Sequence, residues 1–421
     1  MDFAYLGVTL LGALGVFVTY RPLRREPWNV VSFVVGWLTG ELAVQNVVWQ
    51  VAATALFVAF GALSGWPGWV GLGIAVLSWI GLLGLCVEGF FSARAVSQAL
   101  DEVIGGDAGA GRVPPRPTWA RIWRLAPGFP IKGRSIEVIK DVDYFGDGIS
   151  RHRLDVIRAT GTERSGGVLS PAGRPVVVYI HGGAWLIGDK REQGKPMMYE
   201  LAARGWVCVS INYRLSPSAT WPDHIVDCLR AVGWVKENIS QYGGDPSFVA
   251  VSGGSAGGHL CALAALSAGD PRWQPGFESV DTSVDACVPF YGVMDMTNGE
   301  GGGTDEYGPG LRRLLEARVM KTTSADNPQL FRDASPTSRV HRDAPPFFVL
   351  HGRNDTLVPV QIARNFVATL RATSVQMVAY AELPLAQHAF DVLLSPRSRA
   401  TTLGAVEFLE WVRRRPPDLG K

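Results

Sequence analysis

The fold is decided by Phe248-Val249-Ala250-Val251-Ser252-Gly253-Gly254-Ser255-Ala256-Gly257-Gly258. A valine-rich run opens this stretch, and the small apolar residues of 258–266 continue it with the composition of a helix. A Gly-x-Ser-x-Gly sequence between a strand and a helix is typical of a nucleophile elbow, which lifts a serine hydroxyl to the end of a sheet. Glycines flank the serine because such a tight turn leaves no room for side chains. The stretch therefore predicts Ser255 as a nucleophile.

A second glycine pair follows an upstream β-branched run, 175–180, in His181-Gly182-Gly183. By itself this would be a plain turn at the end of a strand. Beside a nucleophile elbow, however, such a loop can offer backbone N–H groups to the negatively charged oxygen of a tetrahedral intermediate. We expect Gly182 and Gly183 to supply these donors, together with Ala256, whose N–H begins the helix after the serine.

An acid and a base follow in chain order. Asp355 stands at the end of the apolar run 346–352, and His388 follows the strand-like run 378–383. The order Ser, Asp, His is the one found in α/β-hydrolases. We therefore expect Ser255, Asp355 and His388 to form a catalytic triad.

Elimination favours His388 among the seven histidines. We expect His259 to pack beneath the elbow, and His351 to lie too near the end of its strand to face Asp355. The others precede the serine or fall in a charged connection: His152, His181, His224 and His341. Asp391 is the rival acid, which we interpret as a residue at the start of a helix.

These motifs, with Asn212-Tyr213-Arg214-Leu215-Ser216-Pro217, resemble the hormone-sensitive-lipase-like carboxylesterases (family IV) of the α/β-hydrolase superfamily. The resemblance covers roughly 135–415. It implies a serine carboxylesterase or lipase that hydrolyses acyl esters through an acyl-enzyme, without a cofactor or metal. Gly254 and Ala184 depart from the family pattern, and they leave two alternatives open: an amide or arylformamidase-like hydrolase, or a prenylcysteine methylesterase. A non-catalytic scaffold is disfavoured because no catalytic group is missing.

Length and composition indicate a membrane region in addition to the hydrolase domain. The 421 residues exceed one hydrolase domain, only 19% are charged, and the mean hydropathy is +0.12. The net charge of +2 gives no sign of nucleic-acid binding. Five cysteines without paired spacing predict free thiols, and we find no spacing typical of metal ligands.

Phe3–Tyr20 and Trp69–Val87 are uncharged runs long enough to span a bilayer. Between them, Trp28–Phe60 predicts one long helix, with two short helices as the alternative, so we favour three spans over four. Asp2 before the first run argues against a signal peptide. The arginines after it, Arg21, Arg24 and Arg25, place that loop in the cytoplasm. We expect an integral protein of the plasma membrane with its catalytic domain on the cytoplasmic side.

The predicted fold class is α/β: an α/β-hydrolase fold, its mainly parallel sheet covered by helices, preceded by a transmembrane helical region. We expect transmembrane helices over 1–92, a linker with cap helices over 93–134, and the catalytic domain over 135–421. Trp119, Ile122 and Trp123 share one face of a helix expected in the linker. Within the catalytic domain we expect a cap insertion near 297–343. The expected partners are an ester substrate and the membrane.

Overall fold

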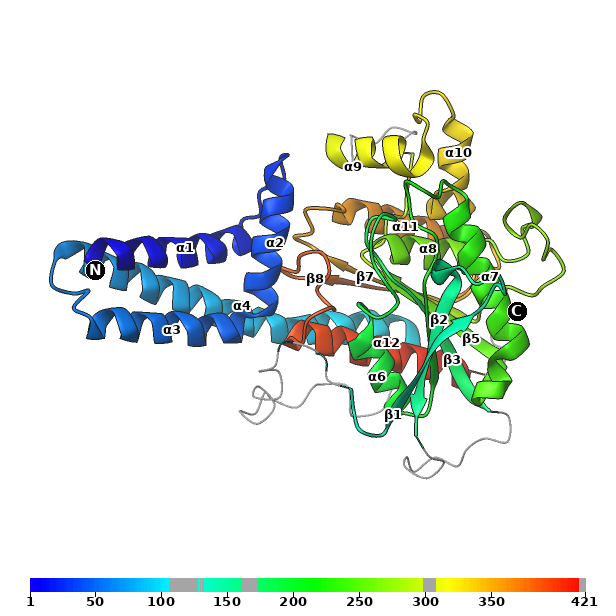
Figure 1. Ribbon diagram of the computed structural model, residues 1–421, viewed down its shortest axis with the longest axis horizontal. Coiled ribbons are helices and arrows are strands. Elements are labelled where there is room, and N and C mark those ends of the chain that lie inside the picture. The colour runs from blue at the N-terminus through cyan, green and yellow to red at the C-terminus, as the bar shows by residue number, and fades with distance from the viewer. Residues whose placement is uncertain (106–127, 129, 131, 161–172, 298–307, 416–421) are drawn as a thin grey trace.

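The computed structural model describes residues 1–105, 128, 130, 132–160, 173–297 and 308–415. Figure 1 shows two parts: a helical bundle that carries the N-terminus at its far end, and a sheet with helices on both faces. The helix expected around Trp119, Ile122 and Trp123 lies outside the described residues.

The sheet has eight strands in the order β1-β2-β4-β3-β5-β6-β7-β8. β1 pairs with β2, and β2 with β4, in antiparallel fashion, whereas all other pairs are parallel. This confirms the mainly parallel sheet. The strands are β1 (Ile136–Asp143), β2 (Arg153–Ala159), β3 (Arg174–Ile180), β4 (Val207–Ile211), β5 (Gly244–Gly254), β6 (Ala286–Phe290), β7 (Phe347–Gly352) and β8 (Val378–Leu383).

Helices cover both faces of the sheet because its central strands are apolar on both sides. The strand residues Val176, Val178 and Val251 belong to the core shared with α7 (Asp223–Asn238), α8 (Ala256–Ala265) and α11 (Val360–Thr373). Val177 and Ala250 point to the opposite core, shared with α6 (Lys195–Ala203), α12 (Pro396–Arg414) and the end of α4 (Trp66–Ile104).

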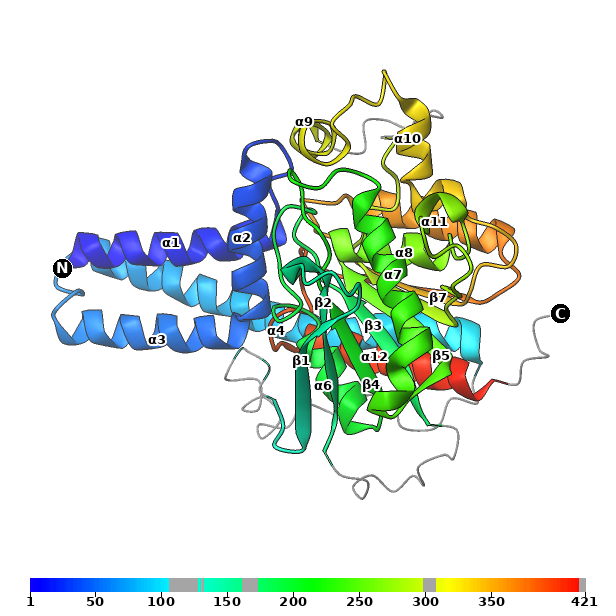
Figure 2. The same cartoon turned by 45° about the vertical axis from the view of Figure 1, so that its right-hand side comes forward.

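Shorter elements connect these layers. Within the expected insertion, α9 (Pro309–Leu314), the π-helical turn η4 (Leu315–Met320) and α10 (Pro328–Asp333) lie together beyond one end of the sheet (Figure 2). The 3-10 turns are η1 (Ser150–His152), η2 (Ile239–Tyr242), η3 (Pro271–Trp273) and η5 (Pro336–Arg339).

The N-terminal region contains α1 (Asp2–Tyr20), α2 (Trp28–Glu41), α3 (Ala43–Ala59) and the first half of α4. In the described residues two helices, α1 and α4, are long and apolar enough to cross a membrane, and there are up to three if α2 and α3 together make one span. The expectation of one long helix over Trp28–Phe60 is wrong, because α2 and α3 meet at an angle of 86°. Glu41 lies at the bend and is buried in an ion pair with Arg397 of α12. This ion pair joins the bend to the hydrolase domain.

The expected boundary at residue 92 falls inside a continuous helix. α4 has 39 residues, and its last part packs beneath the sheet through Val96, Leu100 and Ile104. Residues 93–104 are therefore helical and belong to the core of the hydrolase domain. One continuous helix joins the bundle to that domain (Figure 1).

Candidate active site

Ser255 occupies a sharp turn between β5 and α8, with φ of 57° and ψ of −121°. A non-glycine residue in this region is strained, which is typical of a nucleophile elbow. The neighbouring chain is crowded. A Cβ at Gly253 would lie 2.5 Å from the carbonyl oxygen of Gly257, and one at Gly257 would lie 2.0 Å from that of Ile180. The flanking glycines are therefore required by backbone packing, as the sequence predicted.

The loop after β3 lies against the elbow. A Cβ at Gly182 would be only 3.1 Å from the Cβ of Ser255. Gly183 has φ of 121°, and Ala184 has φ of 53°, so the loop turns sharply beside the serine. The Gly182 N–H donates a 2.8 Å hydrogen bond to Oε1 of Gln193. Gln193, which sequence reasoning missed, therefore occupies one of the three amides expected to bind the oxyanion.

Asp355 and His388 meet at the ends of β7 and β8. His388 Nδ1 lies 2.6 Å from Oδ2 of Asp355, while Oδ1 accepts the backbone N–H groups of Leu357 and Val358 at 2.9 and 2.8 Å. Burial opposes the ionisation of Asp355, but His388 and His351 outweigh it and hold the pKa of this carboxyl well below its usual range. A charged carboxylate therefore faces Nδ1 and orients the imidazole.

Two sequence interpretations need correction here. His351 does reach Asp355: its Nε2 is 3.5 Å from Oδ2, because the turn after β7 brings the acid back over the strand that carries His351. Asp391 does not start a helix, since α12 begins at Pro396. Instead Asp391 is buried and accepts a hydrogen bond from the Tyr291 hydroxyl. Burial raises the pKa of Asp391 to about 6, although the bond from Tyr291 opposes that rise.

Tyr291 lies between the Ser255 turn and His388. Its ring centroid is 4.5 Å from that of His388. A Cβ at Gly254, the residue before Ser255, would lie 2.7 Å from the Tyr291 hydroxyl oxygen. This contact explains why glycine stands at 254, where the resembled family often has an acidic residue: Tyr291 fills the space. Gly254, the residue before Ser255, and His388 thus both lie against Tyr291.

Tyr213, of the motif Asn212–Pro217, supports the loop after β3. The Tyr213 ring stacks on His181 with a centroid distance of 4.5 Å, and its hydroxyl donates to the His181 carbonyl at 3.0 Å. Burial lowers the pKa of His181 to about 4, so this ring is neutral at pH 7. His259 is fully buried and bonded to the Ala334 carbonyl at 2.7 Å, in agreement with its expected packing role.

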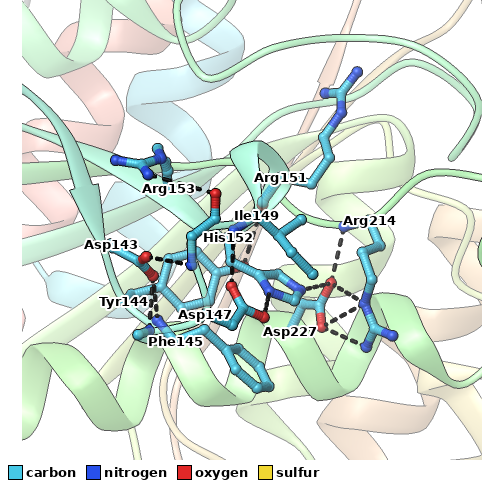
Figure 3. Close-up of polar contacts among 12 residues, drawn as sticks. Asp143, Tyr144, Phe145, Asp147, Ile149, Arg151, His152, Arg153, Arg214 and Asp227 are labelled. Atoms are coloured by element: carbon cyan, nitrogen blue, oxygen red, sulfur yellow. Dashed lines mark hydrogen bonds and ion pairs between the residues drawn. The ribbon is translucent and has the colours of Figure 1, made fainter.

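Arg214, which follows Tyr213 in the Asn212–Pro217 motif, belongs to a polar network (Figure 3). Its guanidinium contacts both carboxylate oxygens of Asp227, with the shortest distance 2.7 Å, and Asp227 lies 3.3 Å from Nε2 of His152. The other ring nitrogen of His152 is 2.7 Å from Asp147. Burial works against a charge on His152, but the two carboxylates outweigh it and raise the pKa of His152. The network holds η1, α7 and the motif together, and it includes neither Ser255, Asp355 nor His388.

A cavity of about 520 Å³ separates the loop after β3 from α9 and η4. Leu186 and Pro217 line one side, and Arg313, Leu314 and Arg318 line the other. The turn between α1 and α2 closes on α9 as well: Glu26 accepts the Gly310 N–H and contacts Arg313 at 3.4 Å. The described residues contain no group of three or more His, Cys, Asp or Glu side chains that could hold a metal ion.

The parallel sheet, the strained serine turn and the acid–histidine pair define an α/β-hydrolase. Comparison with solved structures agrees: esterase B from Lactobacillus rhamnosis aligns with a TM-score of 0.55 at 20% identity, over 70% of this chain and 93% of that one. Residues 170–370 match the BD-FAE family.

A probable carboxylic ester hydrolase of Mycobacterium tuberculosis, LipM, is 42% identical over 96% of this chain and 92% of its own length. Esterase LipQ of the same organism is 50% identical over 64% of this chain and 61% of its own. The chain belongs to this family of carboxylic ester hydrolases, and its substrates are esters. An isoprenylcysteine alpha-carbonyl methylesterase of Arabidopsis thaliana is more distant, with 29% identity over 50% of this chain and 49% of its own length.

Proposed function

We propose that this protein is a membrane-anchored serine carboxylesterase or lipase with Ser255, His388 and Asp355 as its triad. The observation that carries the proposal is the 2.6 Å contact between His388 Nδ1 and Asp355 Oδ2. Tyr291 connects this pair to the strained Ser255 turn, because its ring centroid lies 4.5 Å from that of His388 and its hydroxyl fills the space beside Gly254. Since the carboxylate holds Nδ1, the Nε2 lone pair is the one left to act as a base.

In this mechanism Nε2 of His388 removes the Ser255 proton while the serine Oγ attacks the ester carbonyl. The N–H groups of Gly183 and Ala256 bind the oxyanion, joined by Gly182 if substrate displaces Gln193. His388 then gives the proton to the leaving alcohol, and the acyl group stays on Ser255. Water, activated by the same histidine, releases the acid and restores the enzyme.

The membrane anchor is the second part of the proposal. We propose that α1, α3 and the first half of α4 span the bilayer and that α2 lies at its surface. α3 has 17 residues, which is at the lower limit for a spanning helix. The loop that carries Asp355 contacts Thr19, Arg24 and Asn29. These contacts favour the same side of the membrane for residues 21–27 and for the catalytic domain. The arginines of that turn favour the cytoplasmic side of the plasma membrane.

The triad is tested with full-length protein in detergent, using nitrophenyl butyrate and a serine-directed fluorophosphonate. Ser255→Ala should lower the hydrolysis rate at least 10⁴-fold and abolish labelling. The control is Ser247→Ala, because Ser247 is exposed at the opposite end of β5. Undiminished labelling of Ser255→Ala would reject Ser255 as the nucleophile. Protease access to the C-terminal region in sealed vesicles tests the orientation.

The distant methylesterase relative favours one alternative, a prenylcysteine methylesterase acting with the same groups. A parallel assay with a farnesylcysteine methyl ester and a formyl-amide distinguishes it from a general esterase and from an amide hydrolase. Release of methanol from the prenylated ester alone would favour the alternative.

A further inference from the structure

The base His388 contacts a residue of the N-terminal region. The ring of Phe33, on α2, meets the His388 ring edge-on at a centroid distance of 5.9 Å. Phe33 in turn stacks on Trp37, one turn further along α2, at 5.8 Å and 18°. The indole of Trp37 donates a 2.9 Å hydrogen bond to the carbonyl of Ala389. Two aromatic residues of α2 thus form part of the wall around the catalytic histidine.

α2 lies in van der Waals contact with the loop that carries His388. A Cβ at Gly36 would lie 3.4 Å from Cγ of Gln387, the residue before His388. The start of α2 is held at the same place, since the Thr356 hydroxyl donates to the Asn29 carbonyl at 2.8 Å. α2 is therefore fixed against both loops that carry the acid and the base.

The aromatic pair continues into an exposed apolar surface. Val30 precedes Phe33 by three residues and lies on the same face of the helix, one turn away. Val30 is 53% exposed, although Phe33 beside it contacts the active site. On a helix that lies at the membrane surface, such an exposed apolar side chain is available to an apolar ligand in that surface.

We propose that Val30, Phe33 and Trp37 of α2 bind the acyl chain of an amphipathic ester that enters from the membrane surface. The inference rests on the proposed function and deepens it by naming the substrate class. α2 crosses the hydrolase-facing end of the bundle (Figure 1). An ester dissolved in the bilayer surface meets this helix first, and its acyl chain can follow the apolar side chains to His388 while the carbonyl reaches Ser255.

The test compares acyl chains of two lengths on full-length protein in mixed micelles: nitrophenyl butyrate and nitrophenyl dodecanoate. Val30→Asn should lower kcat/KM for the dodecanoate about tenfold, as expected from loss of one apolar side-chain contact, and change the butyrate value less than twofold. Val31→Asn is the matched control. Val31 is of the same type, is 49% exposed, and lies about 160° round the helix from Phe33.

A second variant keeps the test decisive if the asparagine disturbs the membrane region. Val30→Trp remains apolar but fills the surface, so it should shift the preference toward the shorter chain. Equal dodecanoate-to-butyrate ratios in wild type, Val30→Asn and Val30→Trp would overturn the proposal. This failure is distinct from that of the triad, because Ser255→Ala acts equally on both substrates.

Discussion

The guanidinium of Arg24 donates a 3.0 Å hydrogen bond to the backbone carbonyl of Asp355, although 331 positions separate the two residues. The same side chain reaches the Arg353 carbonyl at 3.1 Å. Nearby, the Asn354 side chain donates to the Thr19 carbonyl at 3.0 Å. The turn after α1 and the acid loop are therefore one structural unit, and the geometry at the acid depends on the N-terminal region.

Arg24→Ala should therefore lower kcat more than it changes KM, by about tenfold, because a loosened acid loop misplaces the base. Arg25→Ala is the control for the loss of one positive charge from the same turn. Steady-state kinetics with the butyrate ester measure both variants. Equal activity of the two would mean that Arg24 does not position the acid loop.

Asp355→Asn should reduce kcat by about three to four orders of magnitude, because an amide neither orients nor stabilises a protonated imidazole as a carboxylate does. Asp391→Asn is the matched control, since Asp391 is also a buried acid near His388 but bonds Tyr291 instead. We expect it to stay within a few-fold of wild type. Similar losses in both variants would contradict the assignment of Asp355.

Asp391→Asn should also stabilise the protein at high pH. Burial raises the folded pKa of Asp391 from 3.8 to about 6, so the folded state binds its proton more tightly than the unfolded state does. The ionised Asp391 carboxylate does not destabilise the folded state below about pH 4. Its destabilising contribution grows between about pH 4 and 6 and is complete above about pH 6. The variant should therefore unfold at a higher temperature than wild type at pH 8 but not at pH 4. Thermal scans at both values check this, and a lower Tm at pH 8 would contradict it.

His152 should show the opposite dependence. Its folded pKa is raised, so the stability that its charge contributes is fully present below the unfolded value of about 6.5 and is lost as pH rises through the folded value. His152→Gln keeps a polar side chain but cannot be charged between Asp147 and Asp227. The Tm difference between wild type and variant should be larger at pH 5.5 than at pH 9. A constant difference would show that His152 contributes only packing.

Local patterns predicted the sheet and the elbow because these depend on short-range requirements. A valine-rich strand, glycines beside a serine and a turn after each strand are visible in consecutive residues. Four of the cysteines are buried in the structure: Cys208, Cys228, Cys261 and Cys287.

The sequence by itself determined that an α/β-hydrolase fold follows an apolar N-terminal region, because strand periodicity, turn glycines and hydropathy are properties of neighbouring residues. Only the tertiary structure decided that α2 and α3 meet at 86°, that His351 joins His388 at Asp355, and that Phe33 contacts His388. These contacts join residues far apart in the chain, and they depend on how loops fold back and on which buried groups find partners. No local pattern encodes such distances.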